Sequence, residues 1–186
     1  MWRGLARAYQ FFANASETGD SATILDGTNL IEGTQAATAM KIYLGFTVAG
    51  NRSSLQAART ISAELQSLGH EVLTTHLVAE NAWEVDRRLP PQQIFARDMG
   101  WLADCDLLVA EVSGSSFGVG FETGFVLGAT QKRAILFFHR EAEPHISLLI
   151  TGNNHPNCTL VRYGSIDELP ALVRNHLGAL PSPVPP

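Results

Sequence analysis

The chain of 186 residues has only two cysteines, Cys105 and Cys158, which stand far apart. Two isolated cysteines form neither a disulfide framework nor a zinc-type ligand set, and they are typical of a reducing compartment. The six histidines are scattered and show no HxxxH or HExxH spacing. The sequence therefore predicts no metal site, and we expect no cofactor.

Long apolar runs are also missing: no uncharged stretch reaches the roughly 18–20 residues that a bilayer span needs. Lys and Arg number 13 against 18 Asp and Glu, which gives a formal net charge of −5. A broad basic face for a nucleic-acid polymer is therefore not expected, although a few arginines or backbone N–H groups could hold a small phosphate. The chain does have 45% hydrophobic residues, enough for one sizeable core. We expect a cytoplasmic single-domain protein without a membrane partner.

The two ends of the chain differ from its middle. Residues 1–39 begin with a basic amphipathic stretch and continue without periodicity, so they are interpreted as a flexible or disordered extension. An organellar presequence and translation from Met40 are the alternatives. We place the domain at residues 40–180, followed at 181–186 by a proline-rich tail that cannot continue a helix.

Between these ends, apolar β-forming runs alternate with segments of helical period. The predicted strands are 41–47, 71–75, 106–112, 134–138 and 159–163. The predicted helices are 53–68, 92–103, 121–130 and 166–177, with a short one near Ile146 and an irregular loop at 78–91. This alternation predicts an α/β fold with a mainly parallel five-stranded sheet and helices on both faces. Ligands of such folds bind at the carboxyl ends of the strands.

The densest chemical signal is the turn from Ser113 to Gly120, which joins the third strand to the next helix. Glycines let the backbone approach a ligand closely, and the N-terminus of a helix attracts anions. The Gly118-x-Gly120 spacing alone is weak, because a dinucleotide fingerprint follows the first strand and no Lys-Ser/Thr completes a P-loop. A small phosphate is therefore predicted rather than a dinucleotide.

Two carboxylates, one of them beside this turn, are candidates for catalysis. Glu122 is expected in the first turn of the helix, where it either stabilises the helix end or reacts. Asp98 is either a solvated residue of the helix 92–103 or a second catalytic acid. Two carboxylates suit glycoside chemistry, in which one attacks the anomeric carbon and the other protonates the leaving group. Tyr43 either orients the nucleophile or packs, and His76 either faces the ligand or lies at the surface.

Several motifs together resemble the nucleoside 2-deoxyribosyltransferase-like superfamily, and within it the 2′-deoxynucleoside 5′-phosphate N-hydrolases. They are Tyr43, DMGWL (98–102), ADCD (103–106), VAEV (109–112) and SFGVGFE (116–122). The resemblance covers about residues 40–178 and is most specific from Asp98 to Gly124. It implies a Rossmann-like (flavodoxin-like) fold, a homodimer, and hydrolysis of deoxynucleoside 5′-monophosphates to free base and 2-deoxyribose 5-phosphate.

The resemblance also implies roles for single residues. Glu122 matches the nucleophile that attacks C1′ and forms a glycosyl-enzyme, Asp98 the carboxylate that assists departure of the base, and Tyr43 the tyrosine beside the sugar. The implied substrate contacts are Phe46, Thr47, Val48, Gly50, His76, Ser116, Gly118 and Ser147. Among these, Ser116 and Gly118 match the phosphate-binding turn, and Ser147 matches a serine that the neighbouring subunit contributes to the phosphate.

One stretch departs from the family pattern. After the first strand the family typically has Gly-Ser-Ile-Arg-Gly, whereas this chain has FTVAG at 46–50. Ala49 stands at the arginine position, and Arg52 is the candidate to compensate for it. The departure bears on base preference and affinity more than on the type of reaction.

Two other functions compete with hydrolysis. A deoxyribosyltransferase would pass the sugar to a second base, and a nucleotide-binding module would have no activity. Ser116 and Ser147 favour the hydrolase, because they fit a phosphate where a transferase holds a free 5′-hydroxyl. The set of Tyr43, Asp98 and Glu122 argues against pure binding, which needs no such residues.

Overall fold

The computed structural model describes residues 38–48, 54–130 and 132–179, all within one compact unit, 37–186. Nearly all of the predicted extension, the tail 181–186, and Gly50 with Ala49 and Arg52 lie outside the described residues. Among the described helices, none is both long enough and apolar enough to cross a bilayer.

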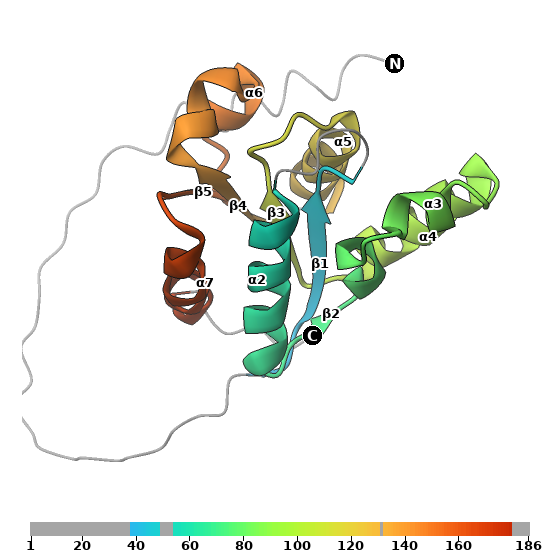
Figure 1. Ribbon diagram of the computed structural model, residues 1–186, viewed down its shortest axis with the longest axis horizontal. Helices are drawn as coiled ribbons and strands as arrows, with labels where there is room; N and C mark the ends of the chain where they lie inside the picture. The colour runs from blue at the N-terminus through green and yellow to red at the C-terminus, as the bar shows by residue number, and fades with distance from the viewer. Residues whose placement is uncertain (1–37, 49–53, 131, 180–186) are drawn as a thin grey trace, which may run out of the picture. The chain divides into compact units, whose positions relative to one another are not determined.

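The described strands form one sheet in the order β2-β1-β3-β4-β5 (Figure 1). They are β1 (Lys41–Phe46), β2 (Glu71–Val72), β3 (Leu107–Glu111), β4 (Arg133–His139) and β5 (Cys158–Tyr163). All neighbouring strands are parallel, so each connection must cross a face of the sheet. The predicted α/β fold is confirmed, and its strand order is the flavodoxin-like one.

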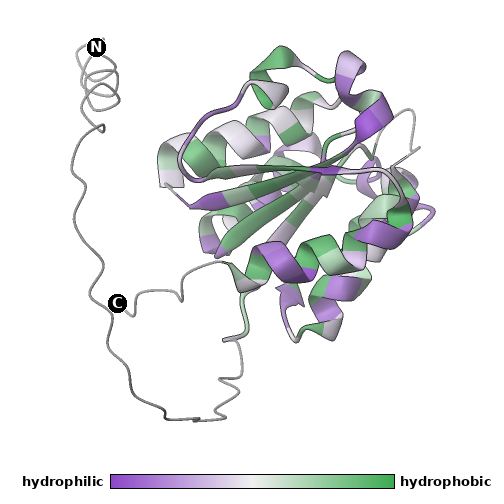
Figure 2. Cartoon of the chain, turned by 90° about the vertical axis from the view of Figure 1, so that its left-hand side faces the viewer, coloured by the Kyte–Doolittle hydropathy of each residue, from purple (hydrophilic) through white to green (hydrophobic). Residues whose placement is uncertain are grey.

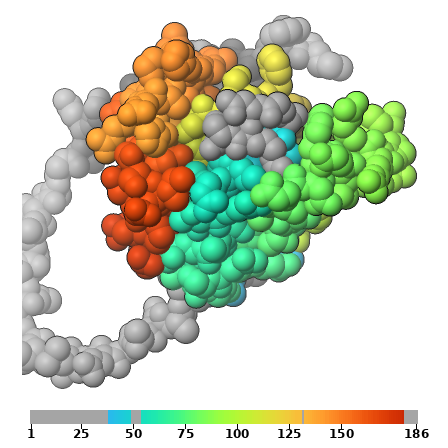
Figure 3. Space-filling view, viewed as in Figure 1, coloured from blue at the N-terminus to red at the C-terminus, as the bar shows by residue number. Residues whose placement is uncertain are grey.

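Helices cover both faces of this sheet. One face carries α2 (Leu55–Ser67) and α7 (Leu169–Gly178), and the other carries α4 (Pro91–Asp104) and α5 (Phe117–Phe125). The green strands in Figure 2 lie between these two layers, and Figure 3 shows α2 and α7 side by side. The central strand β3 is fully buried, because helices cover the sheet on both faces. Its apolar β-forming residues suit contact with both helix layers.

Side chains alternate along each strand, so the core has two parts. Leu44 and Val109 belong to the cluster under α2 and α7. Tyr43 and Leu108 belong to the cluster under α4 and α5. Each fully buried leucine of this kind contributes about 1.5–3 kcal/mol to stability. The same alternation decides which residues at the carboxyl edge can meet.

The prediction of an irregular loop at 78–91 was wrong in part. It contains the short helix α3 (Ala82–Asp86), and a 3-10 turn (Thr75–Val78) precedes it, so the second strand ends at Val72 rather than Thr75. Helices of one turn show too little periodicity to be recognised in a sequence.

The helix predicted at 121–130 also begins earlier than expected. α5 starts at Phe117, where the Ser116 hydroxyl accepts a hydrogen bond from the Val119 N–H at 3.3 Å. A π-helical turn (Val126–Thr130) continues it. Gly118 and Gly120 make the start of the helix hard to recognise in the sequence, because glycine is a poor helix former. Glu122 therefore lies in the second turn of α5, and its expected place in the first turn is corrected.

Candidate active site

A tyrosine and a glutamate meet beneath α5. Tyr43 rises from β1 with 1% of its surface exposed, and its hydroxyl donates a hydrogen bond of 2.9 Å to Oε1 of Glu122. Burial, and next the charge of Glu122, raise the pKa of Tyr43 far above its usual range. The hydroxyl therefore remains a donor at any physiological pH.

Two glycines make room for the Glu122 carboxylate. A Cβ at Gly45, in β1, would stand 3.0 Å from Oε2, and one at Gly118 would stand 4.0 Å from Oε1. The Gly45 position is closer than nearly all real Cβ contacts. A side chain at position 45 would therefore crowd the carboxylate, whereas one at position 118 would only touch it.

Burial raises the pKa of Glu122 to about 7. The hydrogen bond from Tyr43 lowers this pKa, and the negative charge of Asp98 raises it again. The prediction that the helix N-terminus would favour the ionised form is not supported, because Glu122 lies beyond the first turn. A carboxyl that titrates near neutrality is typical of functional sites.

Asp98 lies on α4, held by the residue that precedes it. Arg97 donates from Nε to Oδ1 of Asp98 at 2.8 Å, and from its two terminal nitrogens to Asp86 at 2.9 and 3.3 Å. Asp86 is the last residue of α3. The segment that the sequence analysis interpreted as an irregular loop therefore contacts α4, the helix of Asp98, through the ion pair of Asp86 with Arg97.

His76 lies in the same region, in the 3-10 turn Thr75–Val78. Its ring centroid is 5.5 Å from that of Trp101, and its buried Nε2 has no hydrogen-bond partner in the described part of the chain, with Asp86 Oδ1 3.9 Å away. Burial, and next the positive charge of Arg97, lower the pKa of His76. The imidazole is therefore neutral at pH 7 and able to bond to an uncharged ligand group.

The turn before α5 combines a serine and free backbone N–H groups. The Ser116 side chain caps the helix, and Gly118 follows within its first turn. N–H groups of a first turn have no partner inside the helix, and they attract anions. At the neighbouring strand end, buried Thr47 fills the space beside Gly114: a Cβ on this glycine would stand 2.6 Å from Thr47 Oγ1.

The remaining predicted contacts of β1 lie at its carboxyl end. Phe46 is 3% exposed and pairs in register with Glu111 of β3, and the alternation of the strand directs it to the face opposite Tyr43. Val48 is half-buried just beyond the strand. The structure thus brings Tyr43 and Glu122 into contact but does not place Phe46 beside them.

Ser147 lies apart from Tyr43 and Glu122, since it lines a groove to which neither of them contributes. It caps the short helix α6 (Leu148–Thr151) and is exposed. Ser116 and Ser147 line the same groove of about 530 Å³ between α5 and α6. The groove and its rim are mostly apolar, with Phe117, Leu148 and Leu149 strongly exposed.

A second buried carboxyl was missed by sequence analysis. Glu111, at the end of β3, is 0% exposed and accepts hydrogen bonds from the Tyr163 hydroxyl at 2.8 Å and from Ser113. Its side chain lies on the α2 and α7 face, together with Val109. In the part of the chain that the structure describes, no group of three His, Cys, Asp or Glu is placed to hold a metal ion.

The chain is similar to a known family and to several named proteins. Residues 42–169 match the family described as nucleoside 2-deoxyribosyltransferase. A Thermofilum pendens protein, provisionally named 2′-deoxynucleoside 5′-phosphate N-hydrolase 1, is 38% identical over 129 residues, 69% of this chain and 89% of its own. A Danio rerio protein named 5-hydroxymethyl-dUMP N-hydrolase is 29% identical over 142 residues, 76% of this chain and 98% of its own.

One solved structure supports the fold. The CMP N-glycosidase of Clostridium botulinum superposes with a TM-score of 0.53 at 21% identity, over 73% of this chain and 98% of that one. The matched profile spans both Tyr43 on β1 and Glu122 on α5. The chain therefore belongs to the nucleoside 2-deoxyribosyltransferase family.

Proposed function

We propose that the protein hydrolyses the N-glycosidic bond of 2′-deoxynucleoside 5′-monophosphates to free base and 2-deoxyribose 5-phosphate. The observation that carries this proposal is the Glu122 carboxylate, which is held by Tyr43 and flanked by glycine backbone. The names of relatives matching 67–76% of this chain support a nucleotide N-glycosidase. The preferred base is left to experiment.

In the first step, an oxygen of ionised Glu122 bonds to C1′ while the C1′–N bond breaks. The base leaves with the electron pair of that bond and takes a proton. The Tyr43 hydroxyl fixes Oε1 from below, so the attacking oxygen is held in one orientation before the substrate arrives. Only the deprotonated form of Glu122 can react.

In the second step, water attacks C1′ and Glu122 leaves as a carboxylate. One proton of that water replaces the proton that the base took away, so the overall reaction consumes one water. We assign the proton exchange to Asp98, whose Oδ1 accepts from Arg97: its Oδ2 delivers a proton to the departing base in the first step and takes one from the attacking water in the second. This is the division of labour of retaining glycosidases, with one carboxylate as nucleophile and the other as acid and base.

The 5′-phosphate is assigned to the turn at Ser116 and Gly118. The Ser116 oxygen accepts from Val119, which leaves its hydroxyl hydrogen free to donate to a phosphate oxygen. Together with the first-turn N–H groups, this gives charge-assisted hydrogen bonds worth about 1.5–3 kcal/mol each. Two such bonds correspond to at least about a hundredfold in kcat/KM.

We further propose a homodimer in which the partner's Ser147 reaches the phosphate. Phe117 and Leu149 are strongly exposed and line the groove that holds Ser116 and Ser147, and the adjacent Leu148 is exposed as well. Apolar surface of this kind is typical of an interaction site. A two-fold axis beside the groove would give each phosphate site the same second serine.

The experiment is incubation of the protein with each deoxynucleoside 5′-monophosphate and each matching deoxynucleoside, followed by chromatography of the free base. Release of base from monophosphates alone supports the proposal. Equal efficiency on deoxynucleosides, or transfer of the sugar to an added second base, would instead indicate a deoxyribosyltransferase. No release from any of these substrates would refute catalysis at this bond.

A further inference from the structure

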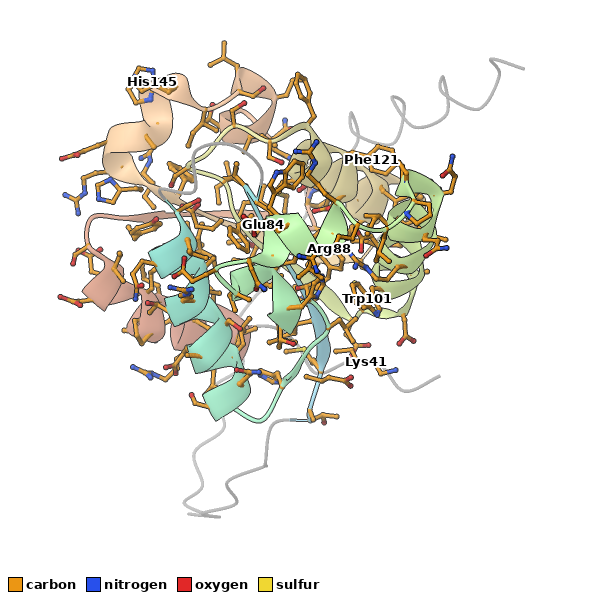
Figure 4. All side chains as sticks on the ribbon, turned by 45° about the vertical axis from the view of Figure 1, so that its right-hand side comes forward. Lys41, Glu84, Arg88, Trp101, Phe121 and His145 are labelled. Atoms are coloured by element: carbon orange, nitrogen blue, oxygen red, sulfur yellow. The ribbon has the colours of Figure 1, made fainter. Side chains whose placement is uncertain are left out.

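The Arg97 guanidinium contacts three other side chains. It forms a bidentate ion pair with Asp86 of α3 and a single hydrogen bond of 2.8 Å with Asp98, and it lies 4.9 Å from the centre of the Trp101 ring. All three charged side chains are sheltered, with 24% of Arg97, 15% of Asp86 and 24% of Asp98 exposed. In Figure 4, Trp101 lies below and to the right of the labelled residues Glu84 and Arg88.

This arrangement is not a consequence of helix geometry. Residues adjacent in a helix do not face each other, whereas residues four apart do. Trp101 is therefore a natural neighbour of Arg97, but Asp98 is not. The bond between Arg97 and Asp98 requires the guanidinium to turn across the helix, and the fork that grips Asp86 fixes it in that position.

We propose that Arg97 is a positioning residue, which anchors itself on Asp86 and thereby orients the Asp98 carboxylate toward the substrate. The inference rests on the proposed function, in which Asp98 exchanges protons with the base and water. Asp98 projects from a helix and has one hydrogen bond in the described part of the chain, the one from Arg97. A carboxylate with one anchored oxygen presents its other oxygen in a defined direction.

The same contacts give α3 a role. Asp86 is the last residue of this helix, so its ion pair with Arg97 connects α3 to α4 near His76. The guanidinium bonds Asp86 with both terminal nitrogens and Asp98 with Nε, and a lysine ammonium lacks the planar fork that this geometry needs. Lysine at position 97 is thus expected to keep the charge but lose the orientation.

The test compares Arg97→Gln, Arg97→Lys and Asp86→Asn with Arg88→Gln, which removes one positive charge from the exposed end of the same segment. Kinetics use the most rapidly cleaved deoxynucleoside 5′-monophosphate. We expect kcat to fall about 10- to 100-fold in Arg97→Gln with KM changed less than about twofold, since misplacement by about 1 Å can cost 10²-fold. Arg97→Lys should recover only part of the loss, and Arg88→Gln should match the native protein.

A double variant separates positioning from a merely structural role. If Asp86 acts through Arg97, adding Asp86→Asn to Arg97→Gln lowers kcat no further. A structural role would instead lower the thermal midpoint of unfolding and leave kcat of the folded protein unchanged. Either an unchanged kcat in Arg97→Gln or fully additive losses would overturn the inference.

Crystal structures of the native protein and Arg97→Gln provide a reading that does not depend on turnover. We expect the Asp98 side chain to leave its native orientation in the variant. If it stays in place, the inference fails even where the native protein releases base. If the native protein cleaves no nucleotide, the proposed function fails, and these two structures still decide whether Arg97 orients Asp98.

Discussion

Replacing Tyr43 with phenylalanine tests the reactive pair most directly, because it removes one hydroxyl and leaves the ring in the core. The hydroxyl stabilises the ionised form of Glu122 and so lowers a pKa that burial raises to about 7. Without this donor, burial and the charge of Asp98 act unopposed. The pKa of Glu122 should therefore rise further in Tyr43→Phe.

The magnitude follows from the strength of the lost bond. A hydrogen bond to a charged group is worth about 1.5–3 kcal/mol. A change of 1 in pKa corresponds to about 1.4 kcal/mol, so the pKa should rise by about 1 to 2. At pH 7 the ionised fraction of Glu122 would fall from about one half to about 1–10%. Because only that form attacks C1′ in the proposed mechanism, kcat/KM at pH 7 should drop about 5- to 50-fold.

The assay is base release from a deoxynucleoside 5′-monophosphate between pH 5 and pH 10. In the native protein kcat/KM should rise with pH through about 7, the pKa of Glu122. In Tyr43→Phe this rise should move to higher pH, with activity largely recovered near pH 9. Tyr163→Phe is the matched control, since it removes a 2.8 Å bond to Glu111 on the opposite face of the sheet. An unshifted profile in Tyr43→Phe, or an equal shift in Tyr163→Phe, would refute the reasoning.

Three further changes give distinct outcomes. Glu122→Gln should abolish base release at every pH and raise the thermal midpoint of unfolding more at pH 8 than at pH 5. The sign follows because an acid whose pKa is raised on folding destabilises the protein as pH rises from about 4.3 toward 7. Gly45→Ala places a methyl group 3.0 Å from Glu122 Oε2 and should lower kcat about 10-fold or more, whereas Gly100→Ala meets no atom within 4 Å and should leave kcat unchanged. Ser147→Ala should raise KM for monophosphates but not for deoxynucleosides, and sedimentation should show a dimer at the assay concentration; a fully active monomer would contradict this.

The fold was predictable because its strands stand out in the sequence. β3 is a short, nearly continuous run of apolar β-formers between polar turns, which is what a strand covered on both faces requires. Tyr43, Asp98 and Glu122 were candidates on position and glycoside chemistry alone, each with a structural alternative, and the resemblance to a known family then implied their roles. The contact between Tyr43 and Glu122 agrees with that resemblance.

Sequence analysis missed residues whose importance depends on side-chain contacts in the folded structure. Gly45 matters only because α5 brings the Glu122 carboxylate against β1, and nothing in a strand pattern indicates that approach. The contact of Arg97 with Asp98 joins helix neighbours, which helical spacing does not predict. The start of α5 could have been recognised from the sequence, because serine is a favoured N-cap residue. The Ser116 hydroxyl accepts a hydrogen bond from the N–H of Val119, three residues later.

Each face of the sheet carries one hydrogen-bonded tyrosine–glutamate pair. Tyr43 donates to Glu122 beneath α5, and Tyr163 donates to Glu111 beneath α2 and α7, at 2.9 and 2.8 Å. In both glutamates burial is the largest cause of a raised pKa. Carboxyl-labelled glutamate marks all 11 glutamates of the chain, and the two with burial-raised pKa values provide a pair of spectroscopic reporters among them. The Glu122 resonance should respond to nucleotide, while that of Glu111 serves as an internal reference for temperature, salt and the integrity of the fold.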